Sequence, residues 1–184
     1  MTAAELHEAA LAYLSRRPAT VAMMTRVLQR KVMKALRRSD AKEENKTGRG
    51  DLEETGEIIR AVVARLVEAG LVNDSTFAST RAKRLSREGR SSRAIAAHLA
   101  QKGVRGEVAR SIIDRDGDLD AALVLTKKRR IGAFRREEIV DAAAKQKELG
   151  VLARAGFDRS TAERALRFDR DEAEERLGAR RALF

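Results

Sequence analysis

One stretch of the chain occurs twice at a fixed interval, and this repetition restricts the possible folds more than any other feature of the sequence. HLAQKGVRGEVARSII, at residues 98–113, aligns with VLARAGFDRSTAERAL, at residues 151–166, with a constant offset of 53 residues. Identical residues recur in the aligned pairs Leu99 and Leu152, Ala100 and Ala153, Gly103 and Gly156, and Ala109 and Ala162. Repetition on this length scale is typical of proteins built from small stacked units rather than around one central core.

A third copy of the same pattern is interrupted. VLQRKVM, at residues 27–33, aligns with the first half of the repeat, and EIIRAVV, at residues 57–63, aligns with the second half. The centre of the insertion between these halves, from Ser39 to Asp51, is polar, mixed in charge and punctuated by glycine. Such a segment has little apolar surface to bury, so we predict a flexible loop near 39–51.

The residue composition indicates that the units are helical. Ala, Leu, Arg, Glu and Lys dominate, aromatic residues make up 3% of the chain, and proline occurs once. These residues favour helices, whereas strands prefer β-branched and aromatic residues. We therefore predict an all-α fold, an elongated tandem array of three-helix repeats. Its expected parts are a first unit at 1–70 that carries the inserted loop, a second at 71–116, a third at 117–168, and an acidic-then-basic C-terminal tail at 169–184.

Capping residues and glycines set the expected helix boundaries. Asn73 or Asp74 is expected to cap a helix that ends before Gly89, and Ser91 or Ser92 is expected to cap the next helix. The other expected helices are 107–113, 119–131 after a cap at Asp118, 136–155, and 159–168 after a cap at Asp158.

The charge of the chain is strongly positive and unevenly distributed. The net charge is +11. Residues 16–38 contain eight Lys and Arg with no acidic residue, and residues 76–105 contain eight with only Glu88 as a counter-charge. Such an imbalance indicates a nucleic acid, an acidic protein groove or a membrane surface as the partner. No apolar run approaches the roughly 20 residues that cross a bilayer, and the N-terminus does not resemble a signal peptide, so we expect a cytoplasmic protein without membrane association.

The cations of the second unit are expected to share one helix face. At 100° per residue, Ala78, Ala82 and Leu85 form a narrow apolar stripe. Lys and Arg side chains lie on the opposite side and continue past the following turns. The candidate filament- or DNA-binding residues are Arg81, Lys83, Arg84, Arg87, Arg90, Arg93, Lys102 and Arg105, followed by a second cluster of Lys127, Lys128, Arg129 and Arg130. A solvated face without a partner is the alternative interpretation, because most charge runs have that role.

Catalytic and metal-binding patterns are missing from the sequence. The chain has no cysteine, no phosphate-binding Gly-rich loop followed by Lys-Ser/Thr, and only two histidines, His7 and His98. No cluster of His, Asp and Glu has the spacing of metal ligands. We therefore expect a protein without catalytic residues, metal or cofactor. The carboxylates after Phe168 are interpreted as a solvated or autoinhibitory acidic tail rather than an acid–base pair.

The stretch from Leu66 to Val104 resembles the signature of the RecX family. Its matching features are a Leu-rich helix ending in glycine, an Asn-Asp pair before Phe-Ala, a basic helix, a glycine turn and a Leu-x-x-Lys-Gly element. The residues that carry the resemblance are Leu66, Gly70, Leu71, Asn73, Asp74, Phe77, Ala78, Gly89, Leu99, Lys102 and Gly103. LARAGFDRSTAERAL near the C-terminus and ALAYLSRRPAT near the N-terminus resemble the closing and opening elements of the family, so that the resemblance covers about residues 8–168.

This resemblance implies a monomeric, non-enzymatic regulator of the RecA recombinase. Members of the family are tandem three-helix repeats that bind in the groove of the RecA–single-stranded DNA filament. They limit filament growth, strand exchange and the linked ATP hydrolysis, and so act in DNA recombination, DNA repair and the SOS response. The implied partners are the RecA filament and single-stranded DNA, with double-stranded DNA as a further partner.

A general DNA-binding protein, in the manner of a helix-turn-helix, is the alternative. The short turn Gly89-Arg90-Ser91 would permit such a motif. A base-reading helix displays Asn, Gln or Arg near its start, and here only Arg93 meets that requirement.

Overall fold

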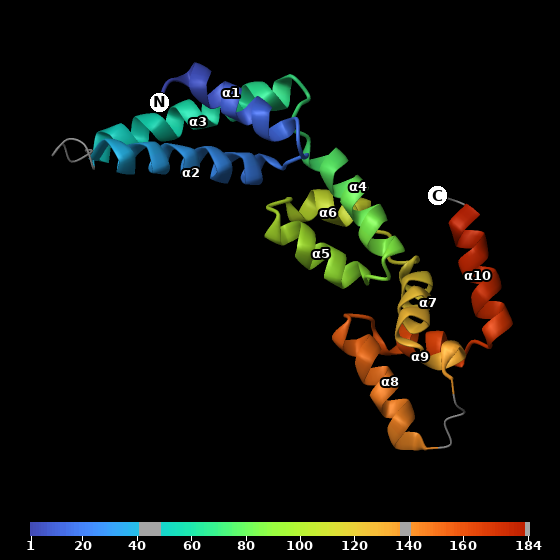
Figure 1. Ribbon diagram of the computed structural model, residues 1–184. Coiled ribbons are helices and arrows are strands. Elements are labelled where there is room, and N and C mark those ends of the chain that lie inside the picture. Colours follow the sequence, from blue (N-terminus) through green and yellow to red (C-terminus); the bar gives the residue numbers. More distant parts are fainter. Residues whose placement is uncertain (41–48, 137–140, 183–184) are drawn as a thin grey trace. The chain divides into compact units, whose positions relative to one another are not determined.

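The computed structural model describes residues 1–40, 49–136 and 141–182, with side chains described at 1–38, 53–136 and 141–180. Within these residues it contains ten α-helices, one short 3-10 helix and no strand (Figure 1). The predicted all-α class is therefore confirmed. The helices pack into two compact units, unit 1 with residues 1–77 and 101–105, and unit 2 with residues 78–100 and 106–184. The division into three-helix repeats at 1–70, 71–116 and 117–168 stays a prediction.

Unit 1 is built around three helices, α1 (Ala3–Leu14), α2 (Val21–Asp40) and α3 (Arg49–Glu68), which lie side by side in Figure 1. Thr2 and Glu5 begin α1 with reciprocal side-chain to backbone hydrogen bonds, the arrangement of a capping box. Apolar residues at helical spacing face one another across the three helices and form a fully buried core. The largest fully buried side chains of this core are those of Leu6, Met24, Leu28, Val62, Leu66 and Val72.

The helices of unit 1 extend further into the insertion than the sequence indicates. The predicted loop begins at Ser39 and ends at Asp51, but α2 continues to Asp40 and α3 already begins at Arg49. The helices therefore enter the predicted loop by two residues at its start and three at its end, and the flexible loop itself stays a prediction. The remainder of the predicted loop, residues 41–48, lies outside the described residues.

The middle of the chain forms α4 (Asp74–Arg87), α5 (Ser92–Gln101) and α6 (Gly106–Ile112). The predicted stripe on α4 is confirmed, since Ala78, Ala82 and Leu85 are all buried. Ile95 and Leu99 of α5 are buried as well. Apolar residues at helical spacing thus provide the inner faces of α4 and α5.

The C-terminal part of unit 2 contains α7 (Asp118–Arg129), the 3-10 helix η1 (Gly132–Phe134), α8 (Ala142–Arg154), α9 (Arg159–Arg167) and α10 (Arg170–Ala182). A second core joins these helices, with Leu123, Phe134, Leu152 and Phe157 among its buried members. The helix predicted at 136–155 begins later, at Ala142 after the N-cap Asp141. Arg135 has an extended backbone, and residues 137–140 lie outside the described residues.

Three of the predicted caps are confirmed, and one is wrong. Asn73 accepts a hydrogen bond from the Thr76 amide at 2.9 Å, Ser91 accepts one from Ala94 at 3.2 Å, and Asp158 accepts one from Thr161 at 2.8 Å. The residue before α7 is Gly117, and Asp118 is the first residue inside that helix. Its carboxylate is bound elsewhere, as described below.

The C-terminal segment is a packed helix rather than a free tail. Asp169 accepts a hydrogen bond from the Glu172 amide at 2.8 Å and so begins α10. Ala173 and Leu177 are buried in the core that includes α7. Arg180 is also buried and donates a hydrogen bond to Ser86 of α4 at 2.6 Å. The acidic residues that the sequence places in a tail therefore belong to an ordered element.

Candidate functional site

A pair of polar contacts fixes the turn before α2 in unit 1. The Thr20 hydroxyl donates to the Lys102 carbonyl at 2.6 Å and accepts from the Met23 amide at 3.1 Å. The Val21 amide donates to the carboxylate of Asp74 at 2.8 Å. One hydroxyl therefore caps α2 and also holds the carbonyl that precedes Gly103.

The same contacts recur in unit 2, around the turn before α5. The Ser91 hydroxyl donates to the Ala155 carbonyl at 2.8 Å. The amide and the hydroxyl of Ser92 both donate to Asp118, each at 2.7 Å. The carboxylate of Asp118 thus serves the start of α5 instead of its own helix. These bonds fix the backbone between the candidate residues Arg90 and Arg93.

The candidate cations of α4 differ in their surroundings. Arg81 is half-buried, and its Nε donates to Nε2 of His98 at 3.0 Å. Arg84 pairs with Glu88 at 3.2 Å, and Arg87 donates to the Lys83 carbonyl at 3.4 Å. Lys83, Arg84 and Arg87 are exposed, as predicted.

The four cations at the end of α7 point to different neighbours. Lys127 pairs with Glu174 of α10 at 3.6 Å and lies 5.2 Å from the centroid of the Phe134 ring. Lys128 instead donates to the backbone carbonyl of Glu88 at 2.7 Å. Arg130 ends the helix in a left-handed conformation, with φ of 55°.

Two candidate residues, Lys102 and Arg105, belong to unit 1. Both lie in the connection between α5 and α6. Lys102 is half-buried, and its carbonyl accepts the Thr20 hydroxyl, while Arg105 is exposed. They are not in the same compact unit as the other candidates.

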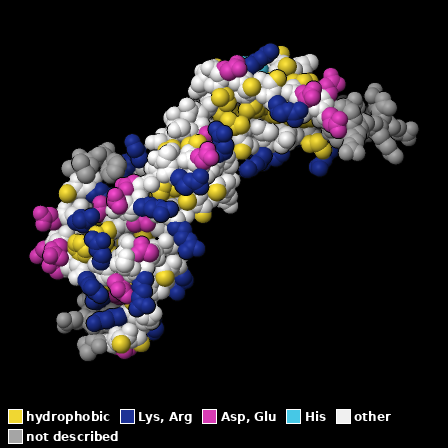
Figure 2. All heavy atoms as spheres, turned by 180° about the vertical axis from the view of Figure 1, so that it is seen from behind, with side chains coloured by type: hydrophobic (Ala, Val, Ile, Leu, Met, Phe, Trp, Pro, Cys, Tyr) yellow, Lys and Arg dark blue, Asp and Glu magenta, His cyan; other side chains and the backbone are white. Residues whose placement is uncertain are grey.

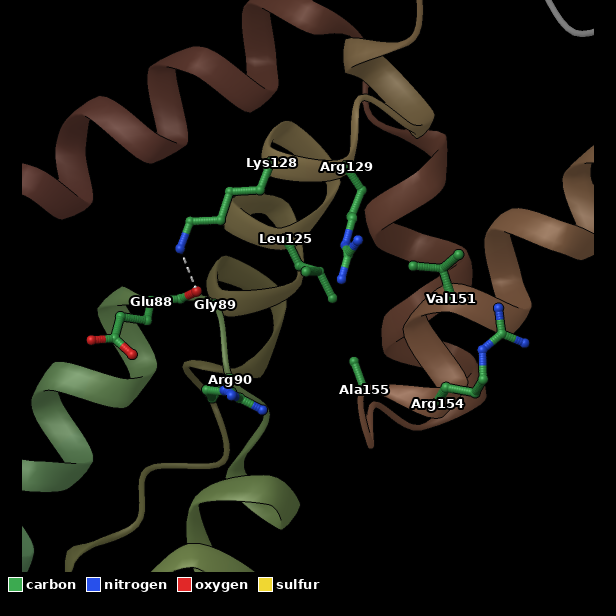
Figure 3. A pocket seen from close by; sticks show the side chains of 9 residues that line it. All are labelled: Glu88, Gly89, Arg90, Leu125, Lys128, Arg129, Val151, Arg154 and Ala155. Carbon is green, nitrogen blue, oxygen red and sulfur yellow. Dashed lines mark hydrogen bonds between the residues drawn. The ribbon is translucent and has the colours of Figure 1, made fainter.

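A pocket of about 730 Å³ brings part of the predicted set together in unit 2 (Figure 3). It lies between the α4–α5 turn, the end of α7 and the end of α8, and Arg90, Lys128 and Arg129 contribute to its lining. Arg90 and Arg129 extend toward the same space from different elements, whereas the Lys128 ammonium is directed to Glu88 (Figure 3). Among the described residues, the guanidinium groups of Arg90 and Arg129 make no ion pair or hydrogen bond.

Arg154, which the sequence analysis did not select, also lines this pocket. Its guanidinium lies back along α8, close to Gly150, where an added Cβ would be 3.2 Å from Nη1. The only sequence signal for it is the LARAGF stretch in which it stands. Its role in the pocket depends on where α8 lies against α7, which a single-sequence pattern does not reveal.

The candidate cations differ in whether a carboxylate of the chain pairs with them. On the face of unit 2 in Figure 2, Lys and Arg side chains alternate with Asp and Glu side chains. Arg84 and Lys127 have carboxylate partners, whereas Lys83, Arg90, Arg93 and Arg129 have none among the described residues. An external anion could therefore pair with the cations that have no carboxylate partner without first displacing a carboxylate of the chain.

Within the described residues, no helix is long and apolar enough to cross a membrane. The residues that the structure describes also contain no group of three or more His, Asp or Glu side chains that could hold a metal ion. The pKa of Asp158 falls to about 2 because its carboxylate accepts hydrogen bonds from the Thr161 amide and the Ser160 and Thr161 hydroxyls. This shift is explained by capping of α9, so it does not mark a catalytic group.

Comparison with known proteins gives relatives over most of the chain. No family model matches the sequence. A Regulatory protein RecX from Myxococcus xanthus is 36% identical over 165 residues, which cover 88% of this chain and 83% of that protein. A Regulatory protein RecX from Agrobacterium fabrum is 33% identical over 106 residues, 58% of this chain and 57% of the relative.

A solved structure has the same fold. The crystal structure of RecX from Lactobacillus salivarius superposes with a TM-score of 0.63 at 16% identity, and the alignment covers 96% of this chain and 97% of that one. At this identity the likeness concerns the fold alone.

Proposed function

The chain belongs to the RecX family, and from that premise we propose that it is a non-enzymatic regulator of the RecA recombinase. In this proposal it binds in the groove of the RecA–single-stranded DNA filament. There it limits filament growth, strand exchange and the linked ATP hydrolysis, in the cytoplasm and as a monomer. Double-stranded DNA is a further partner, and the processes served are recombination, DNA repair and the SOS response.

The observation that carries this proposal is the group of cations without internal partners. Arg90 and Arg129 extend into one pocket, and Lys83 and Arg93 are exposed nearby in the sequence. A cation without a carboxylate partner gains most from an external anion, because no existing ion pair has to break first. A filament of protein and nucleic acid offers such anions in a regular series.

The mechanism that fits is occupancy. A protein bound along the groove contacts more than one subunit of the filament at a time. Rearrangements required for growth or strand exchange would then have to break these contacts. The regulator needs no catalytic group for this effect, because its binding free energy alone opposes the change.

The helix-turn-helix alternative is not supported by the packing around α5. A recognition helix presents its N-terminal residues to the base edges of DNA. Here Ser91 and Ser92 are buried, and their polar groups are bound to Ala155 and Asp118. Entry of this helix end into a DNA groove would require these hydrogen bonds to break.

Co-sedimentation tests the proposal directly. The protein is mixed with RecA filaments preassembled on single-stranded DNA, and separately with the same naked DNA, over a series of salt concentrations. We expect it to pellet with the filament at salt concentrations at which it no longer binds the naked strand. Equal binding to both at every salt concentration would favour a general DNA-binding protein instead.

A further inference from the structure

The pocket between the α4–α5 turn, α7 and α8 combines positive charge with exposed aliphatic surface. Its cations are Arg90, Lys128, Arg129 and Arg154, and its single carboxylate is Glu88. That carboxylate is already paired with Arg84 at 3.2 Å, outside the lining. The positive charge of the pocket is therefore not neutralised from within.

Lys128 has a different role from the two arginines. Its ammonium is held on the Glu88 carbonyl at 2.7 Å, so its position at one edge of the pocket is fixed (Figure 3). The guanidinium groups of Arg90 and Arg129 have no partner among the described residues, so both can pair with a ligand. Each guanidinium presents a planar set of donors that matches a carboxylate or a phosphate with two parallel hydrogen bonds.

The apolar part of the lining separates these two ligand types. Leu125, Val151 and Ala155 are each half-buried, so their aliphatic surface remains partly accessible in the pocket. A single-stranded nucleic acid places its bases on aromatic side chains, and the lining contains none. An aliphatic side chain from a protein would instead bury the surface of Leu125 and Val151 on contact.

We propose that this pocket binds an acidic, aliphatic segment of the RecA protein rather than the DNA of the filament. This inference rests on the proposed function. An aliphatic side chain of that segment packs on Leu125 and Val151. Carboxylates beside it in the same segment pair with Arg90 and Arg129. The pocket thus supplies the protein-directed contact of the regulator, and other exposed cations remain for the nucleic acid.

Occupancy of the pocket can be measured with one cysteine, because the natural chain has none. We place it by Val151→Cys in the lining and, as a matched control, by Ser160→Cys at an exposed position of α9. The rate of alkylation by iodoacetamide is then followed with RecA filament, with naked single-stranded DNA, and with a synthetic peptide of alternating Glu and Leu. Circular dichroism and thermal melting verify that both variants fold.

We expect the filament and the peptide to slow alkylation at residue 151 but not at residue 160. At a ligand concentration about ten times its dissociation constant, the slowing should be roughly tenfold. Adding Arg90→Ala and Arg129→Ala should remove the protection by both ligands. The same substitutions at Arg110 and Arg115, which are exposed and outside the lining, should leave it unchanged.

Two results would overturn the proposal. Equal protection by naked DNA and by the filament would assign the pocket to nucleic acid. Full reactivity at residue 151 in the presence of both filament and peptide would show that no acidic segment enters the pocket. Co-sedimentation of the same variant separates these results from a failure of the proposed function, because it reports whether the filament is bound at all.

Discussion

At the scale of single residues, two glycines decide how closely the chain can pack at its turns. Gly103 has φ of +83°, and a Cβ added there would lie 2.3 Å from Cβ of Ala22. Gly156 has φ of +91°, and its added Cβ would lie 2.7 Å from the Ser91 hydroxyl. These glycines follow the two carbonyls that accept the Thr20 and Ser91 hydroxyls. At each of these two positions, the absence of a Cβ permits both the left-handed backbone of the turn and the close approach of the neighbouring residue.

We predict that Gly103→Ala destabilises the protein more than Gly70→Ala does. Gly70 also has a positive φ, +70°, but an added Cβ there would meet nothing within 4 Å. Both changes therefore carry the left-handed backbone cost of about 1–2 kcal/mol. Only Gly103→Ala adds an overpacking cost of about 1–3 kcal/mol. Urea unfolding of the two variants measures the difference, and equal losses of stability would contradict the clash at Ala22.

Asp158 provides a second residue-scale prediction, which concerns pH. Its pKa of about 2 in the folded protein lies below the ordinary value of 3.8. The ionised cap therefore stabilises the fold fully above about pH 5, and this contribution is lost as the pH falls toward about 2. Asp158→Ala should cost about 1 kcal/mol at neutral pH, which urea unfolding can measure.

Asp158→Asn is the matched control, because asparagine caps a helix but does not titrate in this range. As the pH falls from about 5 to about 2, the free energy of unfolding of the wild type should decrease more than that of this variant. A difference independent of pH would mean that Asp158 is not the titrating group.

Local capping could be predicted from sequence, whereas remote hydrogen bonding could not. Asn73, Ser91 and Asp158 bond to amides three residues ahead, and this spacing is visible in the chain. Asp118 is predicted to cap α7 in the same way, but it is the first residue inside that helix and binds Ser92, 26 residues away. Only the packing of α5 against the start of α7 reveals that partner.

At the scale of elements, Asp118 connects α5 and α7. It accepts both the amide and the hydroxyl of Ser92 at 2.7 Å, and it is the first residue of α7. We predict that Asp118→Ala and Ser92→Ala are coupled, with an interaction free energy of about 1 kcal/mol in a double-mutant cycle. Thermal or urea unfolding of the four proteins gives this value.

Ser92→Ala removes the hydroxyl but leaves the amide, so some of the bond to Asp118 survives in that variant. Asp118→Asn should retain part of the stability, because its side-chain oxygen still accepts a hydrogen bond. Additive effects of the two alanine substitutions would contradict the predicted coupling between the Ser92 hydroxyl and Asp118.

The C-terminal helix shows what composition conceals at this scale. The crowded carboxylates Asp171, Glu172, Glu174 and Glu175 suggest a solvated tail. The buried side of α10 is formed by Ala173, which lies among these carboxylates, and by Leu177, four residues later. Burial also lowers the pKa of Arg180, whose Nη1 is the buried side-chain atom without a hydrogen-bond partner among the described residues. Two small apolar positions are too weak a pattern to predict packing from one sequence.

At the scale of the whole molecule, the function depends on which charges remain available. The sequence located the cations but could not give their directions. Lys127 and Lys128 are adjacent, and each residue turns about 100° around a helix. One pairs with Glu174 of α10 and the other binds the Glu88 carbonyl beside α4. The identity of such partners follows from tertiary packing, so the candidate list could name the residues but not the site they form.

We predict that the double variant Arg84→Glu and Arg87→Glu keeps its helicity but loses its inhibition of RecA ATPase. Both side chains are exposed, so the substitution buries no new charge. If α4 binds the filament as proposed, reversal would place acidic groups against the anions of the filament. The measurement is ATP hydrolysis by RecA on single-stranded DNA, with circular dichroism of each variant.

The matched control is Arg164→Glu with Arg167→Glu on α9. It has the same spacing and the same change in charge, and Arg167 lies 3.8 Å from Glu163 much as Arg84 lies near Glu88. This control should inhibit RecA ATPase as the wild type does. Loss of inhibition in both variants would indicate a dependence on net charge alone rather than on α4.

The paired contacts at Thr20 and Ser91 have a consequence for how such a chain can change its length. Each needs a hydroxyl, a carbonyl before a glycine, and the first aspartate of the second helix further along the chain, Asp74 of α4 for α2 and Asp118 of α7 for α5. An extra segment of the same pattern would bring its own connectors and find complementary ones on both sides. Duplication or loss of a whole segment in the gene would therefore leave the remaining joints intact, and the number of segments could evolve separately from their internal packing.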